Sequence, residues 1–288
     1  MQFARPVNAR LESAAKQTID PGHVTWSVGG FSSMVGRLEG KIALITGTAS
    51  GMGRGAAIRF AQEGAIVFGC DVSVEKNQET VDLVKKAGFK MTGAAPVDLG
   101  NPEAARAWVE EAGNVHGRID ILFNNASSPR LGPMPDFSIE DWDYAIRNEL
   151  SLVFYATKYA WPYLAKRGGV IISTASTAAW IVTPNAGHAS HNAAKGGVLA
   201  LSRAFAADGA PYGIRANTIS PGATRTPELE KNFLKKVPGA EEMVLTKILS
   251  KRIGEPKDIA ALAVFLASDE AEYINGADII IDGGMTAL

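Results

Sequence analysis

The fold is decided by residues 41–53, which read KIALITGTASGMG. An apolar, β-prone run leads directly into a turn that holds three glycines, and an alanine-rich segment follows. The pattern therefore predicts a strand, a glycine turn and a helix. Glycines let the backbone approach a pyrophosphate closely, and the free N–H groups and positive dipole at the start of the helix would stabilise its charge. A tight turn that binds nothing would need the same glycines, so both interpretations stay open at this point.

From residue 41 to the C-terminus, short β-rich apolar runs alternate with longer helical patterns. This alternation is typical of a parallel sheet covered by helices on both faces. We expect strands at 42–46, 65–70, 90–94, 119–124, 169–174, 213–218 and 277–281. We expect helices near 52–63, 74–87, 101–115, 138–166, 190–209 and 256–267. The sequence thus predicts an α/β fold, a single doubly wound Rossmann-like domain with a seven-stranded parallel sheet over residues 37–288.

Composition and charge exclude several classes of protein. Hydrophobic residues make up 46% and charged residues 20% of the chain, as in ordinary globular proteins rather than disordered or coiled-coil ones. The 29 Lys and Arg residues balance 30 Asp and Glu residues, so the chain lacks the basic surface typical of proteins that bind nucleic acid or anionic membranes. No apolar run approaches the roughly 18 residues that a membrane span needs. We therefore expect a small-molecule partner, and neither a nucleic acid nor a membrane.

Cysteine and histidine are both scarce. Cys70 is the only cysteine, which excludes an intramolecular disulfide, and the chain has only four histidines. These counts argue against a Cys/His zinc site, so we expect no metal. A reducing cytoplasm is the expected location.

The first 36 residues differ from the rest of the chain. They carry mixed charge and a Gly/Ser-rich end, and they lack the apolar core of a signal peptide. We interpret residues 1–36 as an N-terminal extension or arm. Two origins stay open, an extension that clasps a second subunit and a stretch upstream of a start at Met34, whereas the acidic residues argue against a transit peptide.

A carboxylate ends the second predicted strand. Asp71 follows Gly53 by 18 residues, where the adenosine ribose of a dinucleotide would lie. A carboxylate there accepts both ribose hydroxyls and repels a 2′-phosphate. No Arg or Lys occupies 48–50 or 72–74 to compensate, so these residues favour NAD over NADP. An exposed acid at a strand end is the alternative interpretation.

With these motifs in order, the sequence resembles the short-chain dehydrogenases/reductases from about Leu38 to the C-terminus. The glycine turn has the family's T-G-x-x-x-G-x-G pattern, and residues 124–126 have its N-N-A-G with Ser127 in place of the last glycine. Residues 217–226 match its N-x-x-x-P-G-x-x-x-T stretch, and 282–284 its Asp-Gly-Gly ending. The cofactor contacts that the resemblance implies, with NAD as the cofactor, are Gly47, Ser50, Gly51, Met52, Gly53, Asp71, Asp98, Asn125, Lys195, Pro221, Gly222, Thr224 and Thr226.

The family's catalytic group is Asn, Ser, Tyr and Lys, the last two as Y-x-x-x-K. Here that place reads HNAAK, so His191 stands where the family has its tyrosine. The spacing puts His191 and Lys195 on one helical face, where Lys195 would bind ribose hydroxyls and lower its neighbour's affinity for a proton. The resemblance assigns Asn148 to the proton-relay water and Ser176 to the substrate oxygen. The chain from Ser176 to His191 is longer than is usual in the family, which predicts an insertion in this loop.

The histidine affects which direction of reaction is favoured. Imidazole titrates near neutral pH, whereas a phenol titrates well above it. Lys195 and a positively charged nicotinamide would both disfavour an imidazolium, so we expect an uncharged His191 at neutral pH. A neutral imidazole accepts an alcohol proton as a general base but donates poorly to a ketone. Oxidation should therefore tolerate the histidine better than reduction.

The sequence predicts an NAD-dependent oxidoreductase that interconverts a hydrophobic secondary alcohol and its ketone by hydride transfer. The hydrophobic substrate is inferred from Trp180 and the segment 227–253 over the cleft. A dimer or tetramer is expected, as is usual in the family, and 138–166 is long enough to form part of a subunit contact. Two alternatives stay open, an NAD-binding protein that the histidine has disabled and a non-redox enzyme with His191 as its base.

Overall fold

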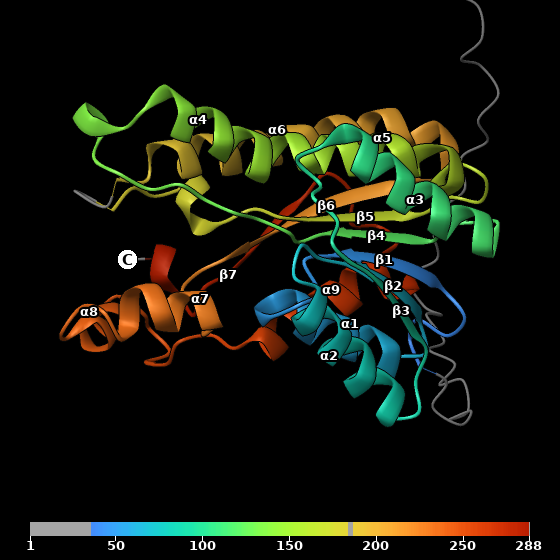
Figure 1. The fold of residues 1–288 in the computed structure, drawn as a ribbon, viewed down its shortest axis with the longest axis horizontal. Helices are drawn as coiled ribbons and strands as arrows, with labels where there is room; N and C mark the ends of the chain where they lie inside the picture. Colours follow the sequence, from blue (N-terminus) through green and yellow to red (C-terminus); the bar gives the residue numbers. More distant parts are fainter. Residues whose placement is uncertain (1–35, 184–186, 288) are drawn as a thin grey trace, which may run out of the picture. The chain divides into compact units, whose positions relative to one another are not determined.

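The computed structural model describes residues 36–183 and 187–287 (Figure 1). Its strands are β1 (Ile42–Thr46), β2 (Ile66–Cys70), β3 (Met91–Ala94), β4 (Ile121–Asn124), β5 (Val170–Thr174), β6 (Arg215–Pro221) and β7 (Asp278–Ile281). They form one seven-stranded parallel sheet in the order β3-β2-β1-β4-β5-β6-β7. The predicted α/β fold with a seven-stranded parallel sheet is therefore confirmed. The predicted bounds differ most for the strand expected at 213–218, because β6 begins at Arg215 and continues to Pro221.

Helices cover both faces of this sheet, as Figure 1 shows. One layer holds α1 (Gly51–Gln62), α2 (Val74–Lys86) and α9 (Pro256–Ala267), and the other holds α3 (Pro102–His116), α5 (Leu152–Leu164) and α6 (Ala189–Gly209). Each layer encloses its own buried cluster. Phe60 and Phe123 stack in the first with their ring centroids 6.2 Å apart, and Phe68 and Trp108 meet in the second at 6.4 Å. Because both faces of the strands are buried, the strands read as continuous apolar runs.

The direction of strand addition reverses at β1, which lies between β2 and β4. Thr46 pairs with Cys70 of β2, and Ile45 pairs with Phe123 of β4. The carboxyl ends of these strands therefore meet at one edge of the sheet. In open α/β sheets, ligands bind at that edge, at the point where the strand order reverses.

The single long helix expected at 138–166 is divided in the structure. It consists of α4 (Ile139–Ile146), a π-helical turn at Arg147–Ser151, and α5. A π turn takes more residues per turn than an α-helix, so it changes the direction in which the following side chains point. Asn148 and Glu149 are both buried within this turn.

The segment between β6 and α9 also contains helices that the sequence pattern does not predict. They are α7 (Pro227–Leu229), a π-helical turn at Glu230–Leu234, and α8 (Ala240–Thr246). Arg225 pairs with Glu230 and with Glu241, which holds the start of this segment against α8. The segment is short of buried apolar residues, since Ala240 is the only buried one in these elements.

Two sequence predictions fall wholly or partly outside the described residues. Residues 1–35 of the predicted arm lie outside them, and so do 184–186 in the predicted loop insertion. The domain extent of 37–288 stays a prediction. Within 36–183 and 187–287, none of the helices combines the length and the hydropathy that crossing a bilayer requires.

Candidate active site

The turn between β1 and α1 is packed so tightly that it admits only glycine at two positions. Gly47 has a φ of +76°, and a Cβ there would lie 2.9 Å from the Cα of Ala126. A Cβ on Gly53 would lie 1.9 Å from the carbonyl oxygen of Gly47. The helix that follows starts at Gly51 with Ser50 as its N-cap, and the Ser50 side chain makes no capping hydrogen bond. The first turn also lacks an acidic side chain, so its N–H groups suit an anion such as a pyrophosphate.

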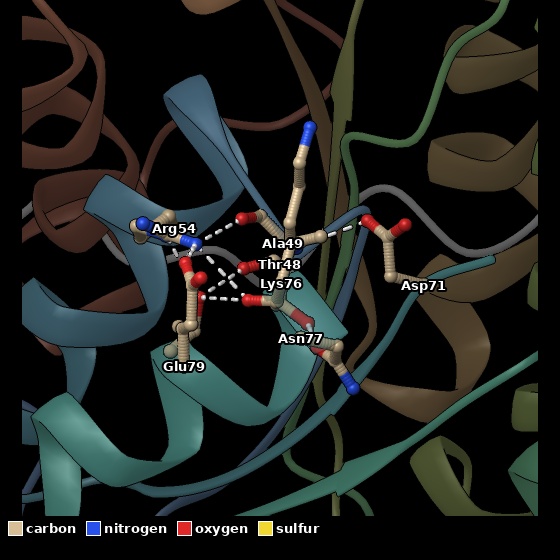
Figure 2. A network of polar contacts seen from close by, with 8 residues as sticks. Thr48, Ala49, Arg54, Asp71, Lys76, Asn77 and Glu79 are labelled. Carbon is tan, nitrogen blue, oxygen red and sulfur yellow. Dashed lines mark hydrogen bonds and ion pairs between the residues drawn. The ribbon is translucent and has the colours of Figure 1, made fainter. Parts of the chain in front are cut away.

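Asp71 is held at the side of this turn. Its Oδ2 accepts a hydrogen bond of 3.0 Å from the backbone N of Ala49, and its Oδ1 accepts one of 2.9 Å from the backbone N of Ser73. Figure 2 shows Asp71 and Arg54 on opposite sides of Ala49. Backbone hydrogen bonds therefore fix the carboxylate where the sequence analysis expects the ribose.

Arg54 is bound to groups on the far side of the turn. Its guanidinium donates to the carbonyl oxygen of Ala49 at 2.5 Å, to that of Lys76 at 3.0 Å and to Glu79 at 2.9 Å. Its Nε donates to the hydroxyl of Thr80 at 2.9 Å. These four contacts hold the turn to α2 (Figure 2). Because they occupy the guanidinium, it does not neutralise the charge of Asp71.

Two further predicted contacts lie along the same edge. Asp98 accepts a 2.9 Å hydrogen bond from the backbone N of Gly100. The side-chain N of Asn125 donates to the carbonyl oxygen of Thr46 at 3.1 Å. The other polar atom of that side chain, Oδ1, is buried and meets no hydrogen-bond donor among the described residues. Buried acceptors are ordinarily hydrogen-bonded, so this oxygen suits a donor from a bound molecule.

The end of β6 lies across from the glycine turn. A Cβ on Gly51 would lie 3.0 Å from the Cγ2 of Thr226, so these two chain segments meet. Gly222 donates its backbone N–H to Ile281 of β7, and Thr224 donates its hydroxyl to the carbonyl oxygen of Gly222 at 3.2 Å. The predicted stretch from Pro221, the last residue of β6, to Thr226 thus faces the same edge of the sheet. Met52, in contrast, packs against the first core cluster.

Glu149 is the centre of a buried polar cluster at this edge. Its two carboxylate oxygens lie 2.9 and 3.0 Å from Nδ1 of His191. The hydroxyl of Ser127 donates to Oε1 at 2.6 Å, and Nζ of Lys195 lies 3.8 Å from that oxygen. Lys195 also donates to the carbonyl oxygen of Thr174 at 3.1 Å. The Glu149 side chain is 0% exposed and the His191 side chain 20%, so His191 connects the buried carboxylate to the surface.

The charges of this cluster affect one another. Burial raises the pKa of Glu149, but the hydrogen bond from His191 and the charge of Lys195 outweigh it and hold that pKa below its ordinary value. Burial lowers the pKa of Lys195, and the charge of Glu149 opposes this shift. Glu149 is therefore ionised at neutral pH. Because a carboxylate can only accept, Nδ1 of His191 must carry the hydrogen between them.

Similarity to known proteins decides the family. A family model described as enoyl-(acyl carrier protein) reductase matches residues 47–286. The 3-oxoacyl-[acyl-carrier-protein] reductase of Thermotoga maritima is 36% identical over 253 residues, which cover 86% of this chain and 99% of that protein. A solved short-chain dehydrogenase from Burkholderia cenocepacia, in complex with NADP, has a TM-score of 0.80 at 32% identity over 87% of this chain and 99% of that one. This chain belongs to the short-chain dehydrogenase/reductase family.

As a short-chain dehydrogenase/reductase, the chain is an oxidoreductase of a family that uses nicotinamide cofactors. A second similar structure is a 7α-hydroxysteroid dehydrogenase complexed with NADH and 7-oxo glycochenodeoxycholic acid. Its TM-score is 0.82 at 31% identity, over 88% of this chain and 98% of that one. The similar structures thus include one with NADP and one with NADH.

The structure of this short-chain dehydrogenase/reductase brings Glu149, rather than Asn148, to His191 and Lys195. The side-chain N of Asn148 donates to the carbonyl oxygen of Tyr144 at 2.9 Å, within the same stretch of helix. The sequence analysis missed Glu149 because the π turn changes the direction of side chains by an amount that α-helical spacing does not show. One signal was present, since Glu149 is an acidic residue that directly follows Asn148, three residues before α5 begins at Leu152.

The other predicted catalytic residue, Ser176, follows β5. Its Oγ accepts a 3.1 Å hydrogen bond from the backbone N of Ala178, at the start of a short turn that packs against α6. Trp180 ends that turn, and its Nε1 donates to Asp278 of β7 at 2.8 Å. Ser176 therefore lies beside the helix of His191 and Lys195, whereas one end of the Trp180 ring is tied to the sheet.

Proposed function

We propose that this chain is an NAD-dependent oxidoreductase that interconverts a hydrophobic secondary alcohol and its ketone, with His191 as the proton-transfer group. One observation carries the proposal. His191 is hydrogen-bonded to a buried, ionised Glu149 and lies on the same helix as a buried Lys195. A histidine oriented by a carboxylate is an arrangement suited to general acid–base catalysis.

The glycine turn and its surroundings fit a nicotinamide dinucleotide. The open first turn of α1 suits the pyrophosphate, and Asn125 offers a buried acceptor that lacks a donor among the described residues. When bound, the dinucleotide supplies the hydride acceptor of the reaction. Pro221, Gly222, Thr224 and Thr226 would hold its nicotinamide end, and Lys195 its ribose hydroxyls.

The preference for NAD rests on Asp71. Its carboxylate is fixed by two backbone N–H groups, and Arg54 is bound to other groups. A 2′-phosphate would therefore approach a negative charge that the guanidinium does not offset. Ribose hydroxyls would instead donate to that carboxylate.

In the proposed reaction, Ser176 holds the oxygen of the substrate and Nε2 of His191 accepts its hydroxyl proton. A bound oxidised dinucleotide would supply the acceptor for the hydride that leaves the carbinol carbon as the carbon–oxygen double bond forms. The products are the ketone, the reduced dinucleotide and an imidazolium, which returns its proton to water. The reverse sequence reduces the ketone.

A hydrophobic substrate is supported by the segment from α7 to α9. Val237, Met243 and Leu249 are 39%, 46% and 52% exposed there. The similar 7α-hydroxysteroid dehydrogenase binds a bulky apolar ligand, an oxo bile acid conjugate. This segment begins directly after Thr226, and apolar side chains on it that face the site would exclude water from the reacting atoms.

A homo-oligomer is the expected assembly, formed through the face of α5 and α6. A groove there is lined by Leu150, Phe154, Tyr155, Gly197 and Leu201. The Phe154 side chain is 43% exposed. An apolar groove on two long helices suits the same surface of a second copy.

The test is the appearance of reduced dinucleotide when the purified chain meets a panel of secondary alcohols, from short aliphatic ones to steroids. We expect turnover with NAD that exceeds turnover with NADP and that increases with the apolar size of the alcohol. Calorimetry measures dinucleotide binding in the same samples. Tight binding of NAD without turnover of any alcohol would favour the disabled form, and turnover only of small polar alcohols would contradict the substrate class.

A further inference from the structure

We propose that Glu149 is a positioning residue that fixes His191 in the tautomer with hydrogen on Nδ1 and stabilises the imidazolium formed when Nε2 takes a proton. This inference rests on the proposed function, since it concerns how the same site moves its proton. The residue acts through His191 and needs no contact of its own with the substrate.

The geometry leaves the carboxylate little freedom. Both of its oxygens lie within 3.0 Å of Nδ1 of His191. Ser127 donates to Oε1 at 2.6 Å, and Nζ of Lys195 lies 3.8 Å away. An ionised group without exposure to water is costly unless it is paired and hydrogen-bonded, and these three contacts meet that need. Glu149 thus presents a fixed acceptor to the imidazole.

The fixed acceptor decides the tautomer. An ionised carboxylate has no hydrogen to donate, so the ring nitrogen that faces it must be the donor. In the neutral ring the other nitrogen, Nε2, then carries the lone pair and can act only as an acceptor. His191 is therefore prepared to take a proton from an alcohol through Nε2.

The same carboxylate changes the charge balance that the sequence alone suggests. The described titratable groups that face His191 are Glu149 from the π turn, Lys195 on its own helix and His188, whose ring centroid lies 6.1 Å away. Lys195 disfavours an imidazolium, whereas Glu149 favours it from the shortest distance. Burial lowers the pKa of His188, which favours its uncharged ring. The proton that leaves the alcohol therefore meets a site that can hold its charge, as in a Ser-His-Asp triad.

Two departures from the family's pattern converge on this carboxylate. His191 stands at the family's tyrosine position and Ser127 at the last glycine of its N-N-A-G motif. Both side chains hydrogen-bond to Glu149. The three residues therefore form one hydrogen-bonded unit, which argues against a histidine that has no function in the site.

The test begins with the imidazole rather than with turnover. We would label the histidine rings with ¹⁵N and record their signals in the full-length chain, assigning His191 by its loss in His191→Asn. In the wild type we expect Nδ1 to carry the hydrogen and Nε2 to be free above neutral pH. In Glu149→Gln we expect mixed tautomers, because an amide can either accept a hydrogen from the ring or donate one to it.

Kinetics of the same variants supply the second readout. Glu149→Gln is expected to lower kcat for alcohol oxidation by about 10²–10⁴-fold and to leave the KM for NAD nearly unchanged. Glu149→Asp should recover part of the loss, and Ser127→Ala, which keeps the carboxylate, should lose less than Glu149→Gln. Thermal unfolding and NAD binding show whether each variant is folded.

The outcomes separate this inference from the proposed function. An unchanged His191 tautomer and an unchanged pH profile of turnover in Glu149→Gln would overturn the inference even if the wild type oxidises alcohols. If the wild type oxidises no alcohol but the tautomer depends on Glu149, the positioning role stands and the proposed reaction fails. If Glu149→Gln does not fold, Glu149→Asp takes its place. A wild-type kcat in Glu149→Asp together with mixed tautomers of His191 would contradict the inference.

Discussion

At the scale of single residues, the site contains two opposite charges that are buried together. The Glu149 and Lys195 side chains are 0% and 4% exposed, and their charged atoms lie 3.8 Å apart. Each charge would be costly without the other, because neither has water to stabilise it. Two partners of this pair reach the surface: His191, whose side chain is 20% exposed, and Ser127, which is exposed. A proton can thus reach the buried carboxylate through the imidazole.

Asp71 gives the first prediction at this scale. Asp71→Ala removes the charge that would repel a 2′-phosphate and the acceptor that would bind ribose hydroxyls. We expect affinity for NADP to rise and affinity for NAD to fall, each by about 10-fold, since charges a few ångströms apart near a surface interact by about 1–4 kcal/mol. Fluorescence titration with each dinucleotide measures both constants without requiring turnover.

A matched control is Asp82→Ala on α2, the helix that follows Asp71. The Asp82 carboxylate accepts a hydrogen bond from the side chain of Gln78. It should leave both affinities unchanged. An Asp71→Ala variant that still discriminates between the two dinucleotides as the wild type does would contradict the role of Asp71.

Sequence reasoning found some of these residues and missed others for identifiable reasons. Asp71 could be predicted because it ends a strand at a fixed spacing from the glycines. His191 and Lys195 were predicted from the resemblance to the family's Y-x-x-x-K motif, and their spacing of four places them on one face of an α-helix. Glu149 could not, because its contacts depend on a π turn and on elements far away in the chain. Ser127 was noticed as a departure, but its partner was not apparent from the sequence.

At the scale of elements, the π turn at Arg147–Ser151 has the largest effect on the site. It joins α4 to α5 and buries Glu149 where a regular helix would direct the side chains differently. The sequence predicted one helix over 138–166 because apolar residues recur there without a break. The spacing of apolar residues in the sequence does not reveal that one turn contains an extra residue. That turn is stabilised by the packing of α4 against α6 and of α5 against α3.

The strands were easier to predict than this helix. Each strand is a short apolar run with turn residues at both ends. Because both faces of the sheet are buried, the run is continuously apolar and is recognised without an alternating pattern. The segment 227–253 was harder, because α7 and α8 are short and bury almost nothing. Helices that form without an apolar face carry little signal in the sequence.

The end of α1 gives a prediction about pH. Glu63 follows that helix and accepts hydrogen bonds from the backbone N and the guanidinium of Arg37, and it also pairs with Arg59. The hydrogen bond from the Arg37 guanidinium is the largest cause that lowers the pKa of Glu63, to about 2. A carboxyl whose pKa is lower in the folded state adds stability above its unfolded pKa of about 4.5, and this is lost as the pH falls toward 2.

Glu63→Gln should therefore lower the free energy of unfolding by about 1–3 kcal/mol at pH 7, and by about half as much or less near pH 3. Urea unfolding at both pH values measures the difference. Glu110→Gln, which breaks an exposed pair with Arg106 on α3, is the control and should change stability by at most about 0.5 kcal/mol. A Glu63→Gln effect of equal size at both pH values would show that the charge is not its cause.

At the scale of the whole molecule, α5 and α6 together present an apolar groove. Phe154 lines this groove and is 43% exposed. Phe154→Asp would place a charge in the proposed contact between copies. We expect the oligomer to dissociate to monomers at micromolar concentration, measured by light scattering after gel filtration, because a buried unpaired charge opposes association.

Tyr273→Asp supplies the comparison, since Tyr273 is fully exposed elsewhere on the surface. It should leave the mass of the wild type unchanged. If the Phe154→Asp variant has the same mass as the wild-type oligomer, the contact must lie on another face.

The most direct test of the central claim is the pH dependence of NAD reduction by the wild type beside its His191→Tyr variant, with the alcohol that turns over best. The account predicts that the histidine form turns over and that its rate rises through the pH range in which an imidazole loses its proton. The tyrosine form should show a different profile, set by a phenol. Turnover by the tyrosine form alone, with NAD bound equally by both, would contradict the account and show that His191 disables the site.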